Sequence, residues 1–224
     1  MKLAAFLSFF AALAMVGGAQ PPAASRSAAD DAKALPSPQL AGPMSLEETL
    51  VARRSVRQFT GAPLTLDQIS QLCWAGQGIT EPKRGLRTAP SAGALYPIEL
   101  YIVTADGVDH YLPDGHKLER HVGSDLRPAL KSAANDQESI GQAGTCVVIT
   151  AVMERTSRKY GERAERFCYV EAGHVGQNIL LQATSLNLAG VPMGAFDDDK
   201  VAAALKLPKD RRVLYLVAIG HPRK

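Results

Sequence analysis

Residues 88–103 most constrain what this chain can fold into, because they join a loop of small residues to an apolar run. Pro90 and Pro97 bracket the loop, and proline disfavours helix at its own position and at the residue before it. Residues 98–103 predict a buried strand. Residues 91–94 leave little side chain above the backbone, so a flat ligand can rest on main-chain N–H and C=O groups. A tight loop that enters a strand explains these residues equally well.

Length, charge and cysteine spacing exclude several classes of protein. The 224 residues suffice for one domain with a real core, and a net charge of +3 is too small to argue for a nucleic-acid partner. The three cysteines show no metal-ligand spacing, so we expect buried thiols rather than a zinc site or a disulfide framework. Residues 197–199 lack the spacing of a calcium loop, and no metal site is predicted.

The N-terminus has the features of a targeting signal. Lys2 precedes an apolar run over residues 3–16 that only Ser8 interrupts, and residues 17–19 are small. The run is short for a membrane span, which needs roughly 20 apolar residues. We predict a signal peptide over residues 1–19, with export to the periplasm or secretion and no stable span after cleavage. An uncleaved anchor is the alternative.

Residues 20–44 are rich in Ala, Pro and Ser, which predicts a flexible linker, so the folded domain is expected to cover residues 45–224. Two capping boxes, Ser45 with Glu48 and Thr65 with Gln68, predict helices that end near Arg57 and near residues 76–78. Three histidines in or beside the predicted hairpin of residues 108–118 are expected to face solvent: His110, His116 and His121. The other expected elements are helices over 125–134, 163–188 and 198–205, and strands over 145–153 and 212–220.

A basic cluster follows the first capping box. Arg53 and Arg57 are four residues apart and are predicted to share a helix face, whereas Arg54 points about 100° away. Guanidinium groups with the hydroxyl of Ser55 can bind a phosphate through charge-assisted hydrogen bonds. A solvated basic helix end that favours the helix dipole is the alternative interpretation.

Four motifs together resemble the nitroreductase family, and within it the SagB-type dehydrogenase branch, which includes oxidases that aromatise azoline rings in peptides. The motifs follow the family's order and cover about residues 45–224. They are residues 53–59 (Arg-Arg-Ser-Val-Arg-Gln-Phe), 89–97 (Ala-Pro-Ser-Ala-Gly-Ala-Leu-Tyr-Pro), 171–178 (Glu-Ala-Gly-His-Val-Gly-Gln-Asn) and 192–196 (Pro-Met-Gly-Ala-Phe).

The resemblance implies an α+β domain with a mixed, mainly antiparallel sheet flanked by helices, working as a homodimer with FMN at the subunit interface. At the positions that match the family's motifs, the resemblance implies specific contacts to FMN. They imply phosphate and ribityl contacts from Arg53, Arg54 and Ser55, a pyrimidine-edge contact from Arg57, a loop along the ring from Pro90, Ser91, Ala92, Gly93 and Leu95, and a backbone N–H opposite N5 within Pro192, Met193, Gly194 and Ala195.

This sequence departs from the family pattern at three places. Simpler nitroreductases have Asn where Ala94 stands, so one polar contact to the ring is absent here or comes from elsewhere. They have Glu where Gly194 stands, so a main-chain contact is retained here but any carboxylate role is lost. Longer members end with a basic pair at the phosphate, and because this sequence stops at Lys224, Arg223 is the candidate substitute.

A possible proton-transfer pair precedes the predicted long helix. Lys159 and Tyr160 fall where the azoline oxidases have a Lys-Tyr pair, and such a pair can shuttle protons during oxidation. A surface lysine beside a partly buried tyrosine is an equally simple interpretation.

We therefore expect an FMN-dependent oxidoreductase that exchanges hydride with a small organic substrate in a ping-pong cycle. Two alternatives stay open. One is an exported flavin-binding module without turnover, because nicotinamide donors are scarce outside the cytoplasm. The other is an azoline-ring oxidase that acts on a peptide together with a partner cyclase.

Overall fold

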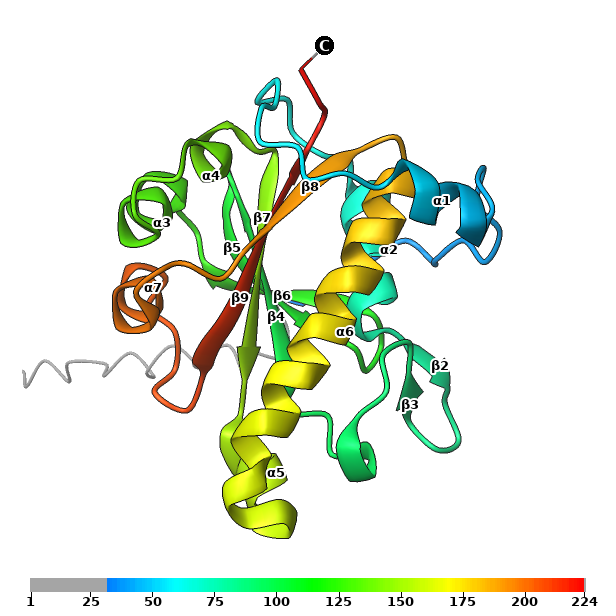
Figure 1. The fold of residues 1–224 in the computed structure, drawn as a ribbon, viewed down its shortest axis with the longest axis vertical. Coiled ribbons are helices and arrows are strands. Elements are labelled where there is room, and N and C mark those ends of the chain that lie inside the picture. Colours follow the sequence, from blue (N-terminus) through cyan, green and yellow to red (C-terminus); the bar gives the residue numbers. More distant parts are fainter. Residues whose placement is uncertain (1–31, 224) are drawn as a thin grey trace, which may run out of the picture. The chain divides into compact units, whose positions relative to one another are not determined.

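The computed structural model describes residues 32–223, so the predicted signal peptide lies outside the described residues. Its centre is a seven-stranded sheet in the order β1-β6-β5-β4-β7-β9-β8, in which every neighbouring pair is antiparallel (Figure 1). The strands are β1 (Lys33–Ala34), β4 (Ile98–Thr104), β5 (Gly107–Leu112), β6 (Lys117–Val122), β7 (Thr145–Ala151), β8 (Ala189–Met193) and β9 (Arg212–Gly220).

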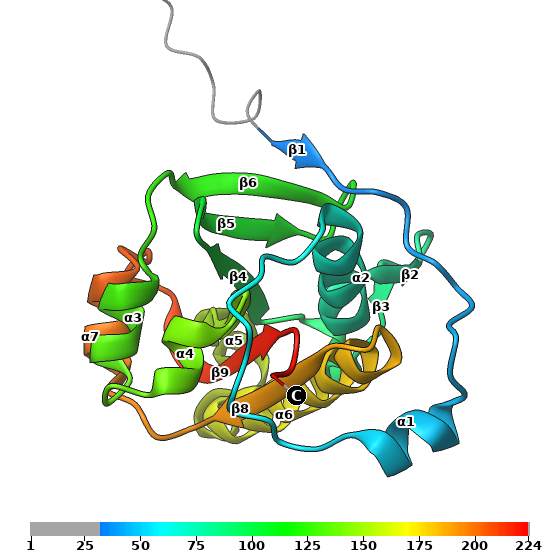
Figure 2. The same cartoon turned by 90° about the horizontal axis from the view of Figure 1, so that it is seen from above.

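Helices cover both faces of the sheet. Figure 2 shows α2 and α6 on one side and α3, α4 and α7 on the other. The helices are α1 (Leu46–Ala52), α2 (Leu66–Gln77), α3 (Arg127–Ala133), α4 (Glu138–Gln142), α5 (Met153–Tyr160), α6 (Ala164–Ser185) and α7 (Asp198–Ala204). Two 3₁₀ turns, η2 (Ala92–Ala94) and η3 (Gly161–Arg163), and a small hairpin of β2 (Ile79–Glu81) and β3 (Leu86–Arg87) complete the described elements. The expected α+β class is confirmed.

Two cores form because β4 and β7 are buried on both faces. Successive side chains of a strand point to opposite faces. Leu100 accordingly packs in the cluster that includes residues of α2 and α6, whereas Tyr101 packs in the cluster that includes residues of α3, α4 and α7. The apolar run predicted from residues 98–103 is therefore the strand that the two helical layers enclose.

The first helix is shorter than predicted. Both capping boxes are present, and Ser45 and Thr65 cap α1 and α2 as expected. However, α1 ends at Ala52, so the expectation that Arg53 and Arg57 share a helix face is wrong. The backbone is extended there because Ser55 pairs with Gly190 and the Val56 N–H donates to the Gly190 carbonyl at 3.1 Å. Hydrogen bonding to β8 replaces the helical bonds that would have continued α1.

The end of the expected linker contacts the fold. Lys33–Ala34 pair with β6, and the next residue, Leu35, is 9% exposed. The three histidines are half-buried, so the expectation that they face solvent is wrong. His110 Nε2 lies 2.6 Å from Glu99 Oε2, and His121 Nε2 lies 3.0 Å from the Leu205 carbonyl oxygen. The two ring nitrogens of His116 lie 2.8 Å from the Tyr111 hydroxyl and 2.7 Å from the Ser70 hydroxyl.

Two further boundaries differ from the expectations. The long helix ends at Ser185 rather than at residue 188, because the chain turns there and enters β8, a strand that the sequence did not predict. The strand expected over residues 145–153 ends at Ala151 and is followed by α5. Within the described residues, every helix is too short or too polar to cross a lipid bilayer.

Candidate active site

The small-residue loop (residues 91–96) has an unusual backbone that three hydrogen bonds hold. Gly93, Ala94 and Tyr96 have φ of 64°, 53° and 46°, in the left-handed region that glycine tolerates best. The Tyr96 N–H donates to Ser91 Oγ at 2.8 Å, and the Ala92 N–H donates to Glu171 Oε1 at 2.8 Å. Arg155 Nη1 donates to the Tyr96 carbonyl at 2.9 Å. The loop is therefore fixed from α5 and from α6.

Lys159 and Tyr160, the predicted proton-transfer pair, lie directly against this loop. A β-carbon added to Gly93 would come within 2.9 Å of Lys159 Nζ and within 2.9 Å of Tyr160 Oη. Lys159 is exposed and Tyr160 is half-buried. Because the loop has no side chain at Gly93, both polar groups lie where a side chain would otherwise stand. The sequence therefore named a pair that the fold places at the loop, and its chemical role stays a prediction.

A buried carboxylate, Glu99, is connected to the loop through Arg155, and sequence reasoning did not identify it. Glu99 is 8% exposed, with Oε1 2.6 Å from Arg155 Nη1 and Oε2 2.6 Å from His110 Nε2. Burial by itself raises the pKa of Glu99, but the hydrogen bond to His110 and the charge of Arg155 outweigh it and lower the pKa. The available signal was a charged residue inside an apolar strand, which needs a partner when buried. Arg155 thus links Glu99 to the Tyr96 carbonyl.

Tyr96 is also held from the β2–β3 hairpin. The Arg87 N–H donates to Tyr96 Oη at 3.2 Å, and the Arg87 guanidinium lies 4.6 Å from the centre of the ring. Arg87 in turn donates to Gln77 Oε1 at 2.6 Å. The phenol is therefore anchored at its hydroxyl and on its face.

The arginine segment (residues 53–57) lies beside the C-terminal residues. Phe59 pairs with Pro222, and the Arg223 N–H donates to the Gln58 carbonyl at 3.1 Å. The fold thereby brings the predicted phosphate contact Arg223 next to the segment. Within residues 32–223, no carboxylate lies within 4 Å of the four predicted phosphate and ring cations: Arg53, Arg54, Arg57 and Arg223.

A hollow of about 410 Å³ adjoins Arg57. Amide and hydroxyl side chains line it, and among the described residues the amide oxygen of Gln142 has no hydrogen-bond partner. The lining residues are Arg57, Gln58, Gln137, Glu138, Ser139 and Gln142. The sequence did not single out residues 137–142, because amides in a short helix carry no distinctive pattern.

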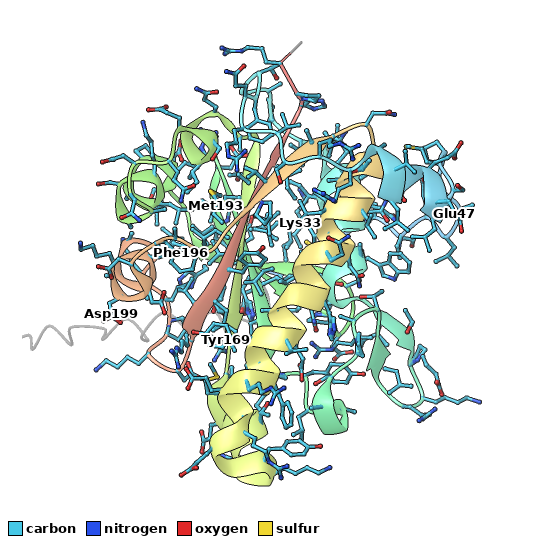
Figure 3. All side chains as sticks on the ribbon, in the orientation of Figure 1. Lys33, Glu47, Tyr169, Met193, Phe196 and Asp199 are labelled. Atoms are coloured by element: carbon cyan, nitrogen blue, oxygen red, sulfur yellow. The ribbon has the colours of Figure 1, made fainter. Side chains whose placement is uncertain are left out.

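The segment of Pro192, Met193, Gly194 and Ala195 adjoins two residues of that lining. Gln137 Nε2 donates to the Ala195 carbonyl at 3.0 Å, and Ser139 Oγ lies 3.5 Å from Met193 Sδ. Figure 3 shows Met193 and Phe196 on the chain that leads from β8 to α7. Gly194 is exposed, and an added β-carbon would meet its nearest neighbour only at 4.0 Å. The backbone at Gly194 is therefore open to a ligand.

The two predicted halves of the site lie at opposite ends of β7. Val152, just after β7, donates its N–H to the Pro97 carbonyl at 2.8 Å, so the small-residue loop is at this end. Ser55 pairs with Gly190, which the sheet register places level with Thr145 at the start of β7. A strand of seven residues spans about 20 Å. One chain thus does not bring the small-residue loop and the arginine segment together.

Comparison with known proteins places these features in a family context. The sequence pattern of the Nitroreductase family matches residues 50–221. A nitroreductase-type protein of Methanocaldococcus jannaschii is 41% identical over 170 residues, which are 73% of this chain and 85% of that protein. The crystal structure of a nitroreductase-type protein from Ralstonia eutropha JMP134 has 30% identity and a TM-score of 0.80, covering 93% of this chain and 97% of that one.

A third relative has a more specific name. The microcin B17-processing protein McbC of Escherichia coli is 27% identical over 155 residues, which are 64% of this chain and 57% of that protein.

Proposed function

The chain belongs to the nitroreductase family, and from that premise we propose that it transfers hydride between bound FMN and a small organic substrate. Membership makes it a flavin-dependent oxidoreductase. The choice of FMN, the ping-pong order of the two half-reactions and the SagB-type branch are parts of the proposal.

The observation that carries the choice of FMN is the arginine segment with Arg223. A phosphate monoester carries about −1.5 to −2 charges at pH 7, and guanidinium groups bind it through charge-assisted hydrogen bonds. Arg53, Arg54 and Arg223 would hold the phosphate, with Ser55 as an additional donor. None of these cations is neutralised by a carboxylate within residues 32–223.

The hollow beside Arg57 has the hydrogen-bonding groups that a flavin ring requires. The pyrimidine edge of the ring presents two carbonyl acceptors and one N–H donor. Arg57 supplies donors, and the amides of Gln137 and Gln142 supply both donors and acceptors. The residues present therefore fit the group, and the flavin when bound supplies the hydride chemistry.

The chain's own residues would support the reaction in three ways. The positive charge of Arg57 favours negative charge that develops on the pyrimidine side of the ring. The exposed backbone at Gly194 would donate its N–H toward the ring. Lys159 Nζ and Tyr160 Oη, which contact the loop at Gly93, would hold or move a proton at the substrate.

A homodimer would complete the site, because one chain separates the loop from the arginine segment by the length of β7. Exposed apolar side chains support such an interface: Leu46 (60%), Leu50 (51%) and Val51 (74%) on α1, and Tyr169 (43%) and Val170 (50%) on α6. Figure 3 labels Glu47 of α1 and Tyr169 of α6. We propose that the loop of one copy faces the arginine segment of the other.

A peptide substrate is the second candidate, and two observations favour it. One is the similarity to McbC, whose name assigns it to microcin B17 processing. The other is the position of Lys159 and Tyr160 at Gly93. On this alternative the chain oxidises azoline rings together with a cyclase. Residues 1–19 support export to the periplasm or secretion as part of either proposal.

An absorption spectrum of the protein as isolated is the first test. We expect the two visible bands of bound flavin, or their appearance after FMN is added. Protein that stays colourless with added FMN would refute the proposal. Anaerobic mixing with NADH, NADPH or dithionite, followed by an acceptor, then separates an enzyme from a flavin-storing module, and parallel double-reciprocal plots would support ping-pong kinetics.

The proposed proton pair has its own matched test. Lys159→Ala and Tyr160→Phe should lower turnover by about 10²-fold or more, whereas Lys209→Ala removes an exposed lysine between α7 and β9 and should not. Turnover of Lys159→Ala and Tyr160→Phe equal to that of Lys209→Ala would remove the pair from the mechanism.

A further inference from the structure

Glu171 is a buried carboxylate in the middle of α6. Glu171 is 5% exposed, and within residues 32–223 no cationic nitrogen lies within 4 Å of its carboxylate oxygens. Its Oε1 accepts the Ala92 N–H at 2.8 Å. Burial raises the pKa of Glu171, against the opposing effects of the Ala92 N–H and of the Ser91 side chain.

A buried carboxylate of this kind lowers the stability of the fold. A buried charge without an oppositely charged partner is unfavourable, and an amide of the same shape would accept the same N–H without the charge. The neighbouring helix residues Ala172 and Val175 are apolar and buried, so packing alone would favour an apolar side chain here. The role of Glu171 therefore lies in the N–H that its oxygen accepts, and the amide oxygen of glutamine can also fill this role.

Among the described residues, the hydrogen bond of the Glu171 side chain goes to the turn that carries the candidate chemistry. The bonded residue, Ala92, follows Ser91, whose Oγ accepts the Tyr96 N–H at 2.8 Å, so the carboxylate holds the chain beside the bond that closes the small-residue loop. The next residue after Ala92 is Gly93, where an added β-carbon would lie 2.9 Å from Lys159 Nζ and 2.9 Å from Tyr160 Oη. A shift of Ala92 would therefore move Gly93 away from these two groups.

We propose that Glu171 is a positioning residue, which holds the turn at Ser91 and Ala92 so that Gly93 stays beneath the polar groups of Lys159 and Tyr160. The inference rests on the proposed function for its consequence in turnover. It concerns this chain's own loop, however, and part of it can be tested without flavin.

The test compares Glu171→Ala and Glu171→Gln with Glu165→Gln, a matched control on the same helix whose carboxylate pairs with Arg212 at 2.9 Å and does not contact the loop. Amide hydrogen exchange is measured on the intact, flavin-free protein and is read in the proteolytic peptide that covers residues 88–96. We expect exchange in Glu171→Ala to be about tenfold or more faster in this peptide alone, because a hydrogen bond to a charged acceptor is lost. In Glu171→Gln the amide oxygen accepts the Ala92 N–H, and exchange should stay near wild type.

Thermal melting between pH 5 and pH 8 adds a readout that loop packing alone would not move. A raised carboxyl pKa means that folded stability is lost as pH rises through that pKa. Glu171→Gln should therefore melt at a higher temperature than wild type above the folded pKa of Glu171, and the difference should shrink as the pH falls through that pKa. The other titratable groups around Glu171 are unchanged in both proteins: Cys168 and His174 on α6, and Lys159 and Tyr160 on α5.

FMN titration gives the last readout. The dissociation constant should be about tenfold higher in Glu171→Ala than in wild type, and within about twofold of wild type in Glu171→Gln. Unchanged loop exchange in Glu171→Ala, failure of Glu171→Gln to restore it, or equal effects in Glu165→Gln would overturn the inference. If wild type binds no FMN, the proposed function fails, and the exchange and melting results still decide the role of Glu171.

Discussion

Replacing Gly93 with alanine tests how closely the loop and the Lys159–Tyr160 pair depend on each other. The added β-carbon would lie 2.9 Å from Lys159 Nζ, 2.9 Å from Tyr160 Oη and 3.5 Å from Lys159 Cδ. Gly93 has φ of 64°, so alanine also adopts a left-handed backbone there. Gly85 provides a matched control, because its φ is 65° and nothing lies within 4 Å of an added β-carbon.

The two costs have different sizes and different readouts. A left-handed φ costs a residue with a β-carbon about 1–2 kcal/mol, and Gly85→Ala and Gly93→Ala should both lose this much stability. Non-bonded heavy atoms prefer separations of about 3.5–4.0 Å. The two polar groups must therefore move by about 0.5–1 Å in Gly93→Ala. Because both groups end flexible side chains, they can move with little further loss of stability.

The displacement should appear in turnover. A shift of about 1 Å in a catalytic group can cost about 10²-fold in rate. We expect urea unfolding to give nearly equal losses for the two variants, and anaerobic half-reactions to slow by about 10- to 100-fold in Gly93→Ala alone. Equal turnover in Gly85→Ala and Gly93→Ala would refute the placement of the pair at the loop.

Three further predictions concern other parts of the chain. Arg53→Gln should weaken FMN binding by about 10-fold or more and leave riboflavin binding unchanged, because riboflavin has no phosphate; equal losses for both ligands would contradict the assignment. Glu99→Gln should destabilise the fold by about 1 kcal/mol at pH 7, because it removes the charge that pairs with Arg155, whose side chain is 38% exposed and therefore partly screened by solvent. Since the pKa of Glu99 is lowered, its stabilisation is present above the ordinary pKa of about 4.3 and lost as pH falls through the folded value, so melting of the variant should depend less on acid than wild type. Burial raises the pKa of Cys146 to about 12, so a thiol reagent at pH 8 should label it only after unfolding.

Features encoded by neighbouring residues were predictable. The capping boxes at Ser45 and Thr65 depend on residues three apart, and both form as expected. The final strand runs from Arg212 to Gly220, within the bounds that its apolar pattern predicts. The family resemblance also identified Lys159 and Tyr160 as a candidate pair, but their position at Gly93, 66 positions before Lys159, came from the fold. Local hydrogen bonding and side-chain periodicity leave such traces in the sequence because they require particular residues at fixed spacing.

Contacts between distant segments were not predictable in this way. Sequence patterns were sufficient for the starts of α1 and α2, for strands β4, β7 and β9, for the family and for the residues that carry its motifs, but not for α5 or β8. The packing of the layers joined Ser55 to Gly190 in place of a helical turn, and Glu171 to Ala92, 79 positions away. It also buried Glu99 between Arg155 and His110. A hydrogen bond between distant residues depends on how the layers pack, and a carboxylate in an apolar run signals the need for a partner without identifying it.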